Sequence, residues 1–293
     1  MNTFPEEAAA KTAMQVKITI LFENAACDSL GIGSLGFAAF IETEKGSYLF
    51  DTGGNACIID NARAYNKDLG TARKIFISHG HWDHTGGLEA VLKVIRREVE
   101  VLGHPDIFLK RYSTRKPWCA SRLRFVGIPY RREYLESLGA NFILSKDFCE
   151  VGEGMFLTGE VPRVTPFERG DPHLVKEIDG KLVPDPVLDD QSLIIDTPKG
   201  LIIVVGCSHA GIINILKYAL QQMGRDDIYA LIGGTHLGYC SVEQQQKSIA
   251  ALKEYRIQKL GACHCTGLEV MSRLAQELPE SFFFANVGTV LEA

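Results

Sequence analysis

The 293-residue sequence predicts a layered α/β fold. Apolar, β-branched runs typical of buried strands alternate with amphipathic runs typical of helices, and polar or histidine-bearing turns join them. This strand–turn–helix order occurs four times, with turns at residues 79–87, 206–211, 233–236 and 261–267. Because strand ends converge on one edge of a layered α/β fold, we expect these four turns to build a common site.

Composition and charge restrict the class of protein. Hydrophobic residues make up 46% and charged residues 23% of the chain, as in ordinary globular proteins with a sizeable core. The net charge of −5 argues against general nucleic-acid binding, and no apolar run reaches the ~20 residues that a membrane-spanning helix needs. Residues 1–15 lack the pattern of a signal peptide. Eight dispersed cysteines are typical of a reduced, cytoplasmic protein.

The densest cluster of candidate metal ligands lies in residues 78–87, Ser-His-Gly-His-Trp-Asp-His-Thr-Gly-Gly. A β-branched run precedes this turn and an amphipathic run follows it. Imidazole and carboxylate groups bind Zn²⁺ and similar divalent ions. A turn at a strand end can direct His79 and His81 one way and Asp83 and His84 another. The motif therefore predicts two neighbouring metal ions, and a solvated histidine-rich turn is the alternative.

The first part of the chain contains a second motif. Residues 31–36 spell GxGxxG, and Asp51 follows twenty residues after the first glycine, as in a dinucleotide-binding fingerprint. That mechanism needs a helix to begin at the glycines, whereas residues 37–42 and 47–51 read as two strands joined by a short turn. We therefore expect a loop that passes close to a ligand or to another loop. Asp51 ends a strand, where it could be a turn residue or could hydrogen-bond a metal-ligating histidine.

Hydrophobic periodicity predicts the remaining elements. The expected helices cover residues 58–69, 88–97, 212–222, 242–255 and 268–277. The expected strands cover residues 16–22, 74–78, 99–102, 192–196, 201–205 and 229–232, with a terminal strand pair or strand and turn at 281–290. No low-complexity tract or linker is evident. We expect a single domain at 16–293 after an N-terminal extension at 1–15, with a basic cap or insert around 104–170.

Residues 110–132 differ from the rest of this acidic chain, because they contain eight Lys or Arg residues and no Asp or Glu. Four aromatic residues are interleaved with these charges. One interpretation is a solvated basic face. The other is a cap that attracts an anionic, phosphorylated substrate and stacks on its ring. The second interpretation makes Arg111, Arg115, Lys116 and Trp118 candidate substrate-binding residues.

Taken together, the motifs resemble the metallo-β-lactamase superfamily. The pattern His-x-His-x-Asp-His after a strand, at residues 79–84, carries the resemblance. Segments 49–53, 206–212, 233–237 and 263–267 look like one branch of it, which contains the archaeal 7,8-dihydropterin-6-yl-methyl-4-(β-D-ribofuranosyl)aminobenzene-5′-phosphate synthase and uncharacterised bacterial relatives. The resemblance covers nearly the whole chain and implies a metallo-β-lactamase-like αββα four-layer sandwich.

The resemblance also implies the ligands of two divalent metal ions. It places His79 and His81 on the first metal, and Asp83, His84 and His264 on the second. Zn²⁺ is the expected cofactor, and manganese or iron are the alternatives.

The middle of the chain departs from the superfamily pattern. A histidine and a bridging aspartate are expected there, and the sequence offers Asp189 and Asp190 at the first place and Cys207 at the second. We expect His209 to be the substitute ligand, with Cys207 and Asp190 as less favoured ligands. Asp51 matches the aspartate that lies behind the metal ligands in the superfamily.

The expected function is that of a metal-dependent hydrolase or transferase acting on a small phosphorylated substrate, with pterin transfer as one form. Asp83 could both bind metal and orient a water molecule, and His236 could contact substrate or act as a general acid. A phosphodiesterase or nuclease of the same fold and a non-catalytic metal-binding module are the alternatives. The expected partner is a small anionic molecule, neither a membrane nor nucleic acid, and a homodimer is left open.

Overall fold

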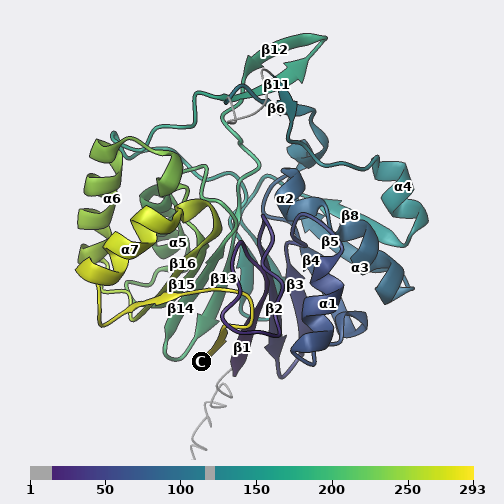
Figure 1. The fold of residues 1–293 in the computed structure, drawn as a ribbon, viewed down its shortest axis with the longest axis horizontal. Coiled ribbons are helices and arrows are strands. Elements are labelled where there is room, and N and C mark those ends of the chain that lie inside the picture. The colour runs from purple at the N-terminus through teal and green to yellow at the C-terminus, as the bar shows by residue number, and fades with distance from the viewer. Residues whose placement is uncertain (1–14, 116–122) are drawn as a thin grey trace, which may run out of the picture.

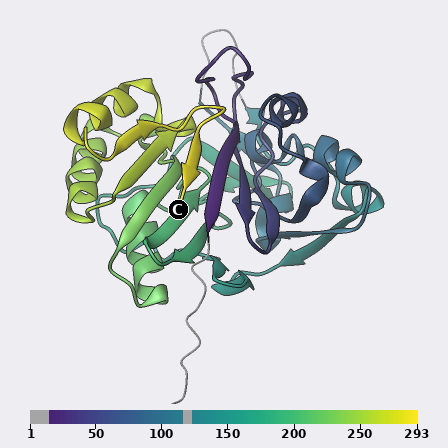
Figure 2. The ribbon, with the colours of Figure 1, turned by 90° about the horizontal axis from the view of Figure 1, so that it is seen from below.

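The protein is a sandwich of two seven-stranded sheets whose outer faces are covered by helices (Figure 1). The computed structural model describes residues 15–115 and 123–293. The four layers confirm the predicted αββα fold class. Seen from below, the first strand and the last strand lie side by side in the middle of the molecule (Figure 2).

The first sheet joins antiparallel N-terminal strands to parallel strands. In spatial order its strands are β18 (Val290–Glu292), β1 (Val16–Phe22), β2 (Ala38–Thr43), β3 (Gly46–Phe50), β4 (Ala72–Phe76), β5 (Val99–Gly103) and β8 (Ala140–Leu144). Its helices are α1 (Cys57–Ala64), α2 (Trp82–Thr85), α3 (Leu88–Ile95) and α4 (Arg132–Ser137). Strands β3, β4 and β5 run parallel, so their carboxyl ends reach the same edge.

The second sheet repeats this combination of antiparallel and parallel strands. In spatial order its strands are β17 (Phe282–Phe284), β16 (Lys259–Cys263), β15 (Ile228–Gly234), β14 (Gly200–Val205), β13 (Ser192–Thr197), β10 (Met155–Leu157) and β9 (Cys149–Gly152). Its helices are α5 (Ile212–Met223), α6 (Val242–Glu254) and α7 (Leu268–Glu277). Strands β14, β15 and β16 run parallel. None of the helices in the described ranges is long and apolar enough to cross a membrane.

A small third sheet stands above the sandwich at the top of Figure 1. Its strands are β12 (Lys181–Pro184), β11 (Leu174–Ile178), β6 (Arg111–Ser113) and β7 (Arg124–Phe125). This differs from the predicted insert at 104–170, because β8, β9 and β10 belong to the main sheets and β11 and β12 lie beyond it. The predicted N-terminal extension lies outside the described residues apart from Gln15.

The layers are held by burial of apolar side chains. Every residue of β14 is buried, as its uninterrupted apolar run predicts. Helix α3 buries Leu88, Val91, Leu92 and Ile95, which share one face of a helix. Each such buried aliphatic side chain contributes about 1.5–3 kcal/mol. Four short 3₁₀ turns complete the described chain: η1 (Leu69–Thr71), η2 (Pro105–Phe108), η3 (Leu237–Tyr239) and η4 (His264–Thr266).

The glycine motif at 31–36 forms a loop, and β2 begins two residues later. No helix starts at these glycines, so the geometry of a dinucleotide-binding turn is absent from this part of the described chain. Gly36 has a φ of +140°, and a Cβ atom there would lie 2.2 Å from the carbonyl oxygen of Asp83. The loop therefore passes directly over the histidine-rich turn, as predicted.

Candidate metal centre

The four polar turns meet where the carboxyl ends of the two parallel groups of strands face each other. The turn after β4 carries three histidines and an aspartate, and the turns after β14, β15 and β16 carry the rest. The side chains that gather there are His79, His81, Asp83, His84, Cys207, His209, His236, His264 and Cys265. Ligand-type side chains from both halves of the fold thus share one buried site.

Four of the strand ends at this site turn through a left-handed residue. The φ angles are 57° at Asp51, 60° at Ser208, 57° at His236 and 52° at His264. Non-glycine residues in this region cost about 1–3 kcal/mol each and persist only where the surroundings hold them. Here the Ser208 hydroxyl donates a hydrogen bond of 2.7 Å to the carbonyl oxygen of Gly234. These left-handed conformations are strained, and they direct the four turns towards one centre.

Two groups of ligand atoms share one sulfur. His79, Cys207 and His209 form the first group, and His84, Cys207 and His264 form the second. Within each group the candidate ligand atoms lie within 4.8 Å of one another. The sulfur of Cys207 is 3.1 Å from Nε2 of His84. Cys207 thus occupies the position between two candidate metal sites.

Two further predicted ligands lie beside these groups. Nδ1 of His81 is 3.0 Å from Nε2 of His79, and a carboxylate oxygen of Asp83 is 3.4 Å from Nε2 of His264. The Nε2 atoms of His209 and His264 are buried without a hydrogen-bond partner. Buried polar atoms normally have partners. Imidazole nitrogens that face one another in this way fit the donor set of a divalent metal ion.

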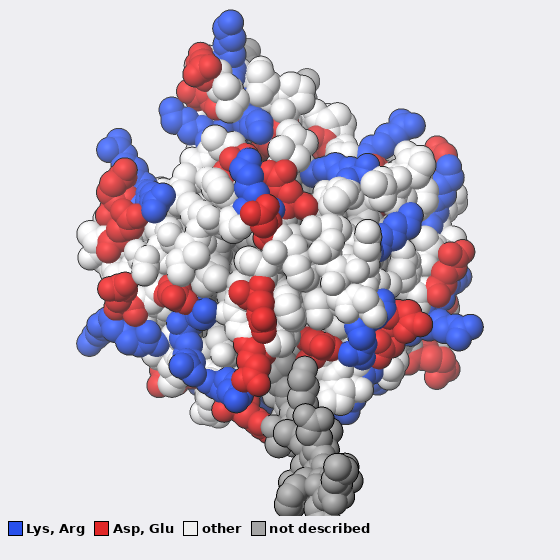
Figure 3. Space-filling model, turned by 180° about the vertical axis from the view of Figure 1, so that it is seen from behind, with Lys and Arg blue, Asp and Glu red and all other residues white. Residues whose placement is uncertain are grey.

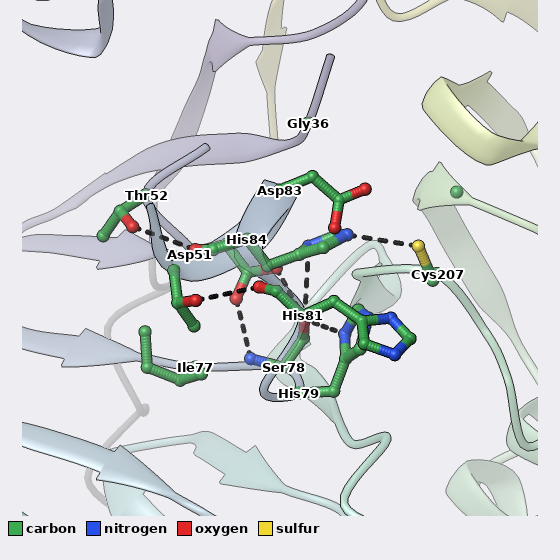
Figure 4. A network of polar contacts seen from close by, with 12 residues as sticks. Gly36, Asp51, Thr52, Ile77, Ser78, His79, His81, Asp83, His84 and Cys207 are labelled. Atoms are coloured by element: carbon green, nitrogen blue, oxygen red, sulfur yellow. Dashed lines mark hydrogen bonds and ion pairs between the residues drawn. The ribbon is translucent and has the colours of Figure 1, made fainter. Parts of the chain in front are cut away.

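Hydrogen bonds behind the ligands orient the rings (Figure 4). The carboxylate of Asp51 accepts bonds from the backbone N–H (2.7 Å) and the hydroxyl (2.6 Å) of Ser78, and it lies 2.7 Å from Nδ1 of His84. The Ser78 hydroxyl also lies 2.9 Å from Nδ1 of His79. With Nδ1 engaged, each ring presents Nε2 to the centre, which is the usual arrangement behind metal-bound histidines.

Asn24 and Glu23 support His264, and the sequence analysis missed both. Oδ1 of Asn24 is 3.0 Å from Nδ1 of His264, and the Glu23 carboxylate accepts the backbone N–H of His264 at 2.7 Å. Burial raises the pKa of Glu23, and hydrogen bonds from backbone N–H groups oppose that rise. The sequence did contain one signal for Glu23 and Asn24: both directly follow a predicted strand, and Asp51 likewise lies at the end of a strand.

The protonation of the histidines follows from burial. Burial, with the neighbouring imidazoles, holds the pKa of His79 and of His209 well below its ordinary value, so both rings are neutral and keep a lone pair for metal. His84 differs. Burial lowers its pKa, but the carboxylates of Asp51 and Asp83 outweigh that effect and raise the pKa to about 9 in the metal-free protein.

The loop before β13 supports the turns. Asp189 accepts the backbone N–H of Gly80 at 2.8 Å. Asp190 accepts the backbone N–H of Ala210 at 2.9 Å, and burial raises its pKa to about 6. Asp190 is not a member of any candidate ligand group among the described residues. Asp190 thus positions the backbone beside His209, while its other carboxylate oxygen is buried without a hydrogen-bond partner, and its role as a less favoured ligand stays a prediction.

His236 belongs to a third group with Cys207 and Cys265, whose candidate ligand atoms also lie within 4.8 Å of one another. Nε2 of His236 is 3.8 Å from the carboxylate of Asp171, which accepts a hydrogen bond of 2.9 Å from Arg115. Burial lowers the pKa of His236, but Asp171 and Cys265 outweigh it and raise the pKa to about 9. The expected role of His236 in contacting substrate stays a prediction.

The predicted substrate-binding residues lie in different surroundings. Arg111 is 1% exposed, and its guanidinium is bound by the carboxylates of Asp185 and Asp189. That placement corrects the prediction for Arg111, because its charge is already neutralised inside the protein. Lys116 and Trp118 lie outside the described residues.

Replacing Arg111 with Ala should lower the free energy of unfolding by about 3–5 kcal/mol, because Asp189 would keep a buried charge without its ion-pair partner and Asp185 would keep only Lys176 at 4.0 Å. Arg115→Ala is the control, because this partly exposed ion pair contributes about 0–1 kcal/mol. Urea unfolding of the two variants measures both values. Equal losses would show that the Arg111 cluster does not stabilise the fold.

Replacing Asn24 with Ala should weaken zinc binding by about 10–100-fold, because the His264 ring would lose the group that orients it. Competition with a chromophoric chelator measures this affinity. Asn141→Ala is the matched control, since its amide bonds Glu98 on the surface. The assignment fails if the two variants bind zinc equally well.

Comparison with known proteins shows which family this sequence resembles. Residues 32–116 match the family described as the metallo-β-lactamase superfamily. The chain is 33% identical over 265 residues to the 7,8-dihydropterin-6-methyl-4-(β-D-ribofuranosyl)-aminobenzene-5′-phosphate synthase of Methanocaldococcus jannaschii, covering 88% of this chain and 89% of that protein. An uncharacterised protein of the same organism is 31% identical over 278 residues, covering 94% and 99% of the two chains.

A solved structure has the same architecture. The crystal structure of a metal-dependent hydrolase of the β-lactamase superfamily is similar with a TM-score of 0.78 and 26% sequence identity, covering 95% of this chain and 99% of that one. Three observations point to the same family: the ligand clusters at the strand ends, the four-layer sandwich, and the similarity along almost the whole chain. The chain belongs to the metallo-β-lactamase superfamily.

Proposed function

We propose that this chain is a metal-dependent enzyme that acts on a small phosphorylated substrate, either as a hydrolase or as a pterin transferase. The observation that carries the proposal is the pair of ligand groups that share the Cys207 sulfur. A phosphorylated substrate is supported by the relative that is 33% identical, whose name describes the synthesis of a 5′-phosphate.

The residues fit a two-metal centre. In the proposed assignment, the first position takes His79, His81 and His209, the second takes Asp83, His84 and His264, and Cys207 lies between them. Imidazole, thiolate and carboxylate together favour Zn²⁺ over harder ions such as Mn²⁺. When bound, such ions supply a Lewis acid for a phosphoryl oxygen and a nucleophile at neutral pH.

Two side chains, Asp83 and His236, are candidates for water orientation and general acid catalysis. Burial opposes ionisation of Asp83, but His84 and His264 hold the pKa of this carboxyl well below its ordinary value, so it is charged at neutral pH. Its side chain is 18% exposed and can orient an attacking water molecule. His236 keeps its proton up to about pH 9 and can donate it to a leaving group. The Asp171 carboxylate, 3.8 Å from Nε2, favours the charged form of the ring.

The charge around the site favours a small substrate over nucleic acid. Within the described part of 110–132, most basic side chains already have an acidic partner. The pairs are Lys110 with Glu177, Arg111 with Asp185 and Asp189, Arg115 with Asp171, and Arg132 with Glu136. On the face seen in Figure 3, basic and acidic side chains are interspersed. No continuous basic track, which nucleic acid would need, crosses that face.

Zinc-loaded protein should hydrolyse or transfer groups from small phosphate monoesters and pterin diphosphates faster than it cleaves a generic phosphodiester. A substrate panel with metal analysis of the same sample tests this. Asp83→Asn should abolish turnover, and Asp60→Asn on the surface of α1 is the control. Comparable turnover of bis-p-nitrophenyl phosphate would favour a phosphodiesterase. Retained metal without turnover of any compound would favour a binding module.

The pH dependence of kcat should report the proton on His236. That proton is present below about pH 9 and lost above it, so turnover should fall on the alkaline side. Asp171→Asn removes the carboxylate that raises this pKa, so the alkaline fall should move to lower pH. His236→Ala should lower kcat, abolish this limb and leave the metal content unchanged. An unmoved limb in Asp171→Asn would contradict the assignment, and lost metal in His236→Ala would make His236 a ligand.

A further inference from the structure

Cys265 is a buried nucleophile that the proposed reaction does not use. It lies in η4, directly after His264, and is 6% exposed. Its sulfur lies within 4.8 Å of the Cys207 sulfur and 3.5 Å from the Cys207 carbonyl oxygen. The backbone N–H of His236 donates to it at 3.3 Å. Two thiols that are 58 residues apart in sequence are therefore held side by side at the centre.

Gly234 provides the room for this contact. A Cβ atom at Gly234 would lie 2.5 Å from the Cys265 sulfur and 3.4 Å from the Cα atom of Cys207. The sulfur therefore fills the space that a side chain on β15 would take. The end of β15 is fixed against β14 by a backbone hydrogen bond of 3.1 Å from Gly234 to Gly206. Because Gly234 has no side chain, the Cys265 sulfur can lie over the end of β15 and reach Cys207.

Neighbouring cysteines have different surroundings. Cys263 lies in the apolar core between the two sheets. The Cys240 sulfur donates to the carbonyl oxygen of His236 at 3.4 Å, and Cys240 joins no candidate ligand group among the described residues. Of the thiols in the described ranges, Cys207 and Cys265 are the two that share a group.

We propose that Cys207 and Cys265 form a reversible oxidation site, in which hydrogen peroxide joins them as a disulfide when metal is absent. The inference rests on the metal-binding role proposed for Cys207, but on no particular substrate. A disulfide sulfur carries no thiolate charge, so both ligand groups would lose their shared member. Metal occupancy and oxidation therefore compete for one sulfur atom.

The reaction balances with peroxide as the oxidant. One thiolate attacks a peroxide oxygen, the O–O bond breaks, and a sulfenic acid and hydroxide form. The second thiolate attacks the sulfenic sulfur, the S–S bond forms, and the S–O bond breaks with loss of a second hydroxide. The thiol protons convert the two hydroxides to water. Two thiols lose two electrons, and one peroxide yields two water molecules.

Geometry explains why bound metal should protect the pair. A disulfide needs its sulfurs about 2.05 Å apart, whereas the Cys207 sulfur now lies 3.1 Å from Nε2 of His84 and within 4.8 Å of the Cys265 sulfur, so at least one of the two thiols must move. If Cys207 held a metal ion, the lone pairs of its thiolate would be engaged and less available to react with peroxide or with Cys265. The zinc-loaded protein should therefore keep both thiols under conditions that oxidise the metal-free protein.

The test compares zinc-loaded and chelator-treated full-length protein, each exposed to a small excess of hydrogen peroxide. The treated metal-free protein should lose two titratable thiols and about 2 Da of mass, with a cross-linked peptide pair containing Cys207 and Cys265. Its zinc uptake should fall by at least tenfold and return after dithiothreitol. Oxygen adducts without the cross-link, or unchanged zinc uptake after cross-linking, would overturn the proposal.

Two variants sharpen the result. Cys265→Ser should form no cross-link, while its unoxidised form takes up as much zinc as the wild type. Reduced zinc uptake by unoxidised Cys265→Ser would make Cys265 a ligand of a third metal position and overturn the oxidation site. Cys240→Ser is the matched control and should behave as the wild type. Because mass, thiols and zinc are measured without turnover, failure of the proposed enzymatic function would leave this test intact.

Discussion

The buried Asp51 carboxylate is the interaction on which the rest of the site depends. It accepts two hydrogen bonds from Ser78 and pairs with Nδ1 of His84. A buried charge is costly unless its partners are complete, so these bonds fix the turn after β4 against the end of β3. By engaging Nδ1, they direct Nε2 of His84 towards the centre, and the Ser78 hydroxyl does the same for His79. The Asp51 carboxylate and the Ser78 hydroxyl thus determine which ring nitrogen of each histidine faces the centre.

Much of this arrangement could be predicted from local sequence. The strand–turn–helix units are visible because each polar turn follows an apolar run, and parallel strands bring such turns to one edge. Long-range polar partners could not be predicted. Asn24 meets His264 across 240 residues, and no periodicity signals such a pair. Likewise, a count of charges cannot show that Arg111 is already paired with Asp185 and Asp189, which lie more than 70 residues further on.

A thiol at position 207 distinguishes this centre from one built around a bridging carboxylate. Zn–S bonds are about 2.3 Å long, compared with about 2.0–2.2 Å for Zn–O bonds, and thiolate is the softer ligand. Both properties support the proposed choice of zinc over manganese. Because one sulfur belongs to all three candidate ligand groups found among the described residues, a substitution at Cys207 affects all of them together.

The contact of Glu23 and Asn24 with His264 has a consequence for how the protein is made. Closing a loop of 240 residues is slow compared with forming local structure. At about 5–20 residues per second of synthesis, roughly 12–50 s separate the emergence of Asn24 from that of His264. For the later part of that interval the histidines after β4 have been synthesised, while the ligands of the last turns do not yet exist. Assembly of the whole centre, and its loading with metal, must therefore follow translation.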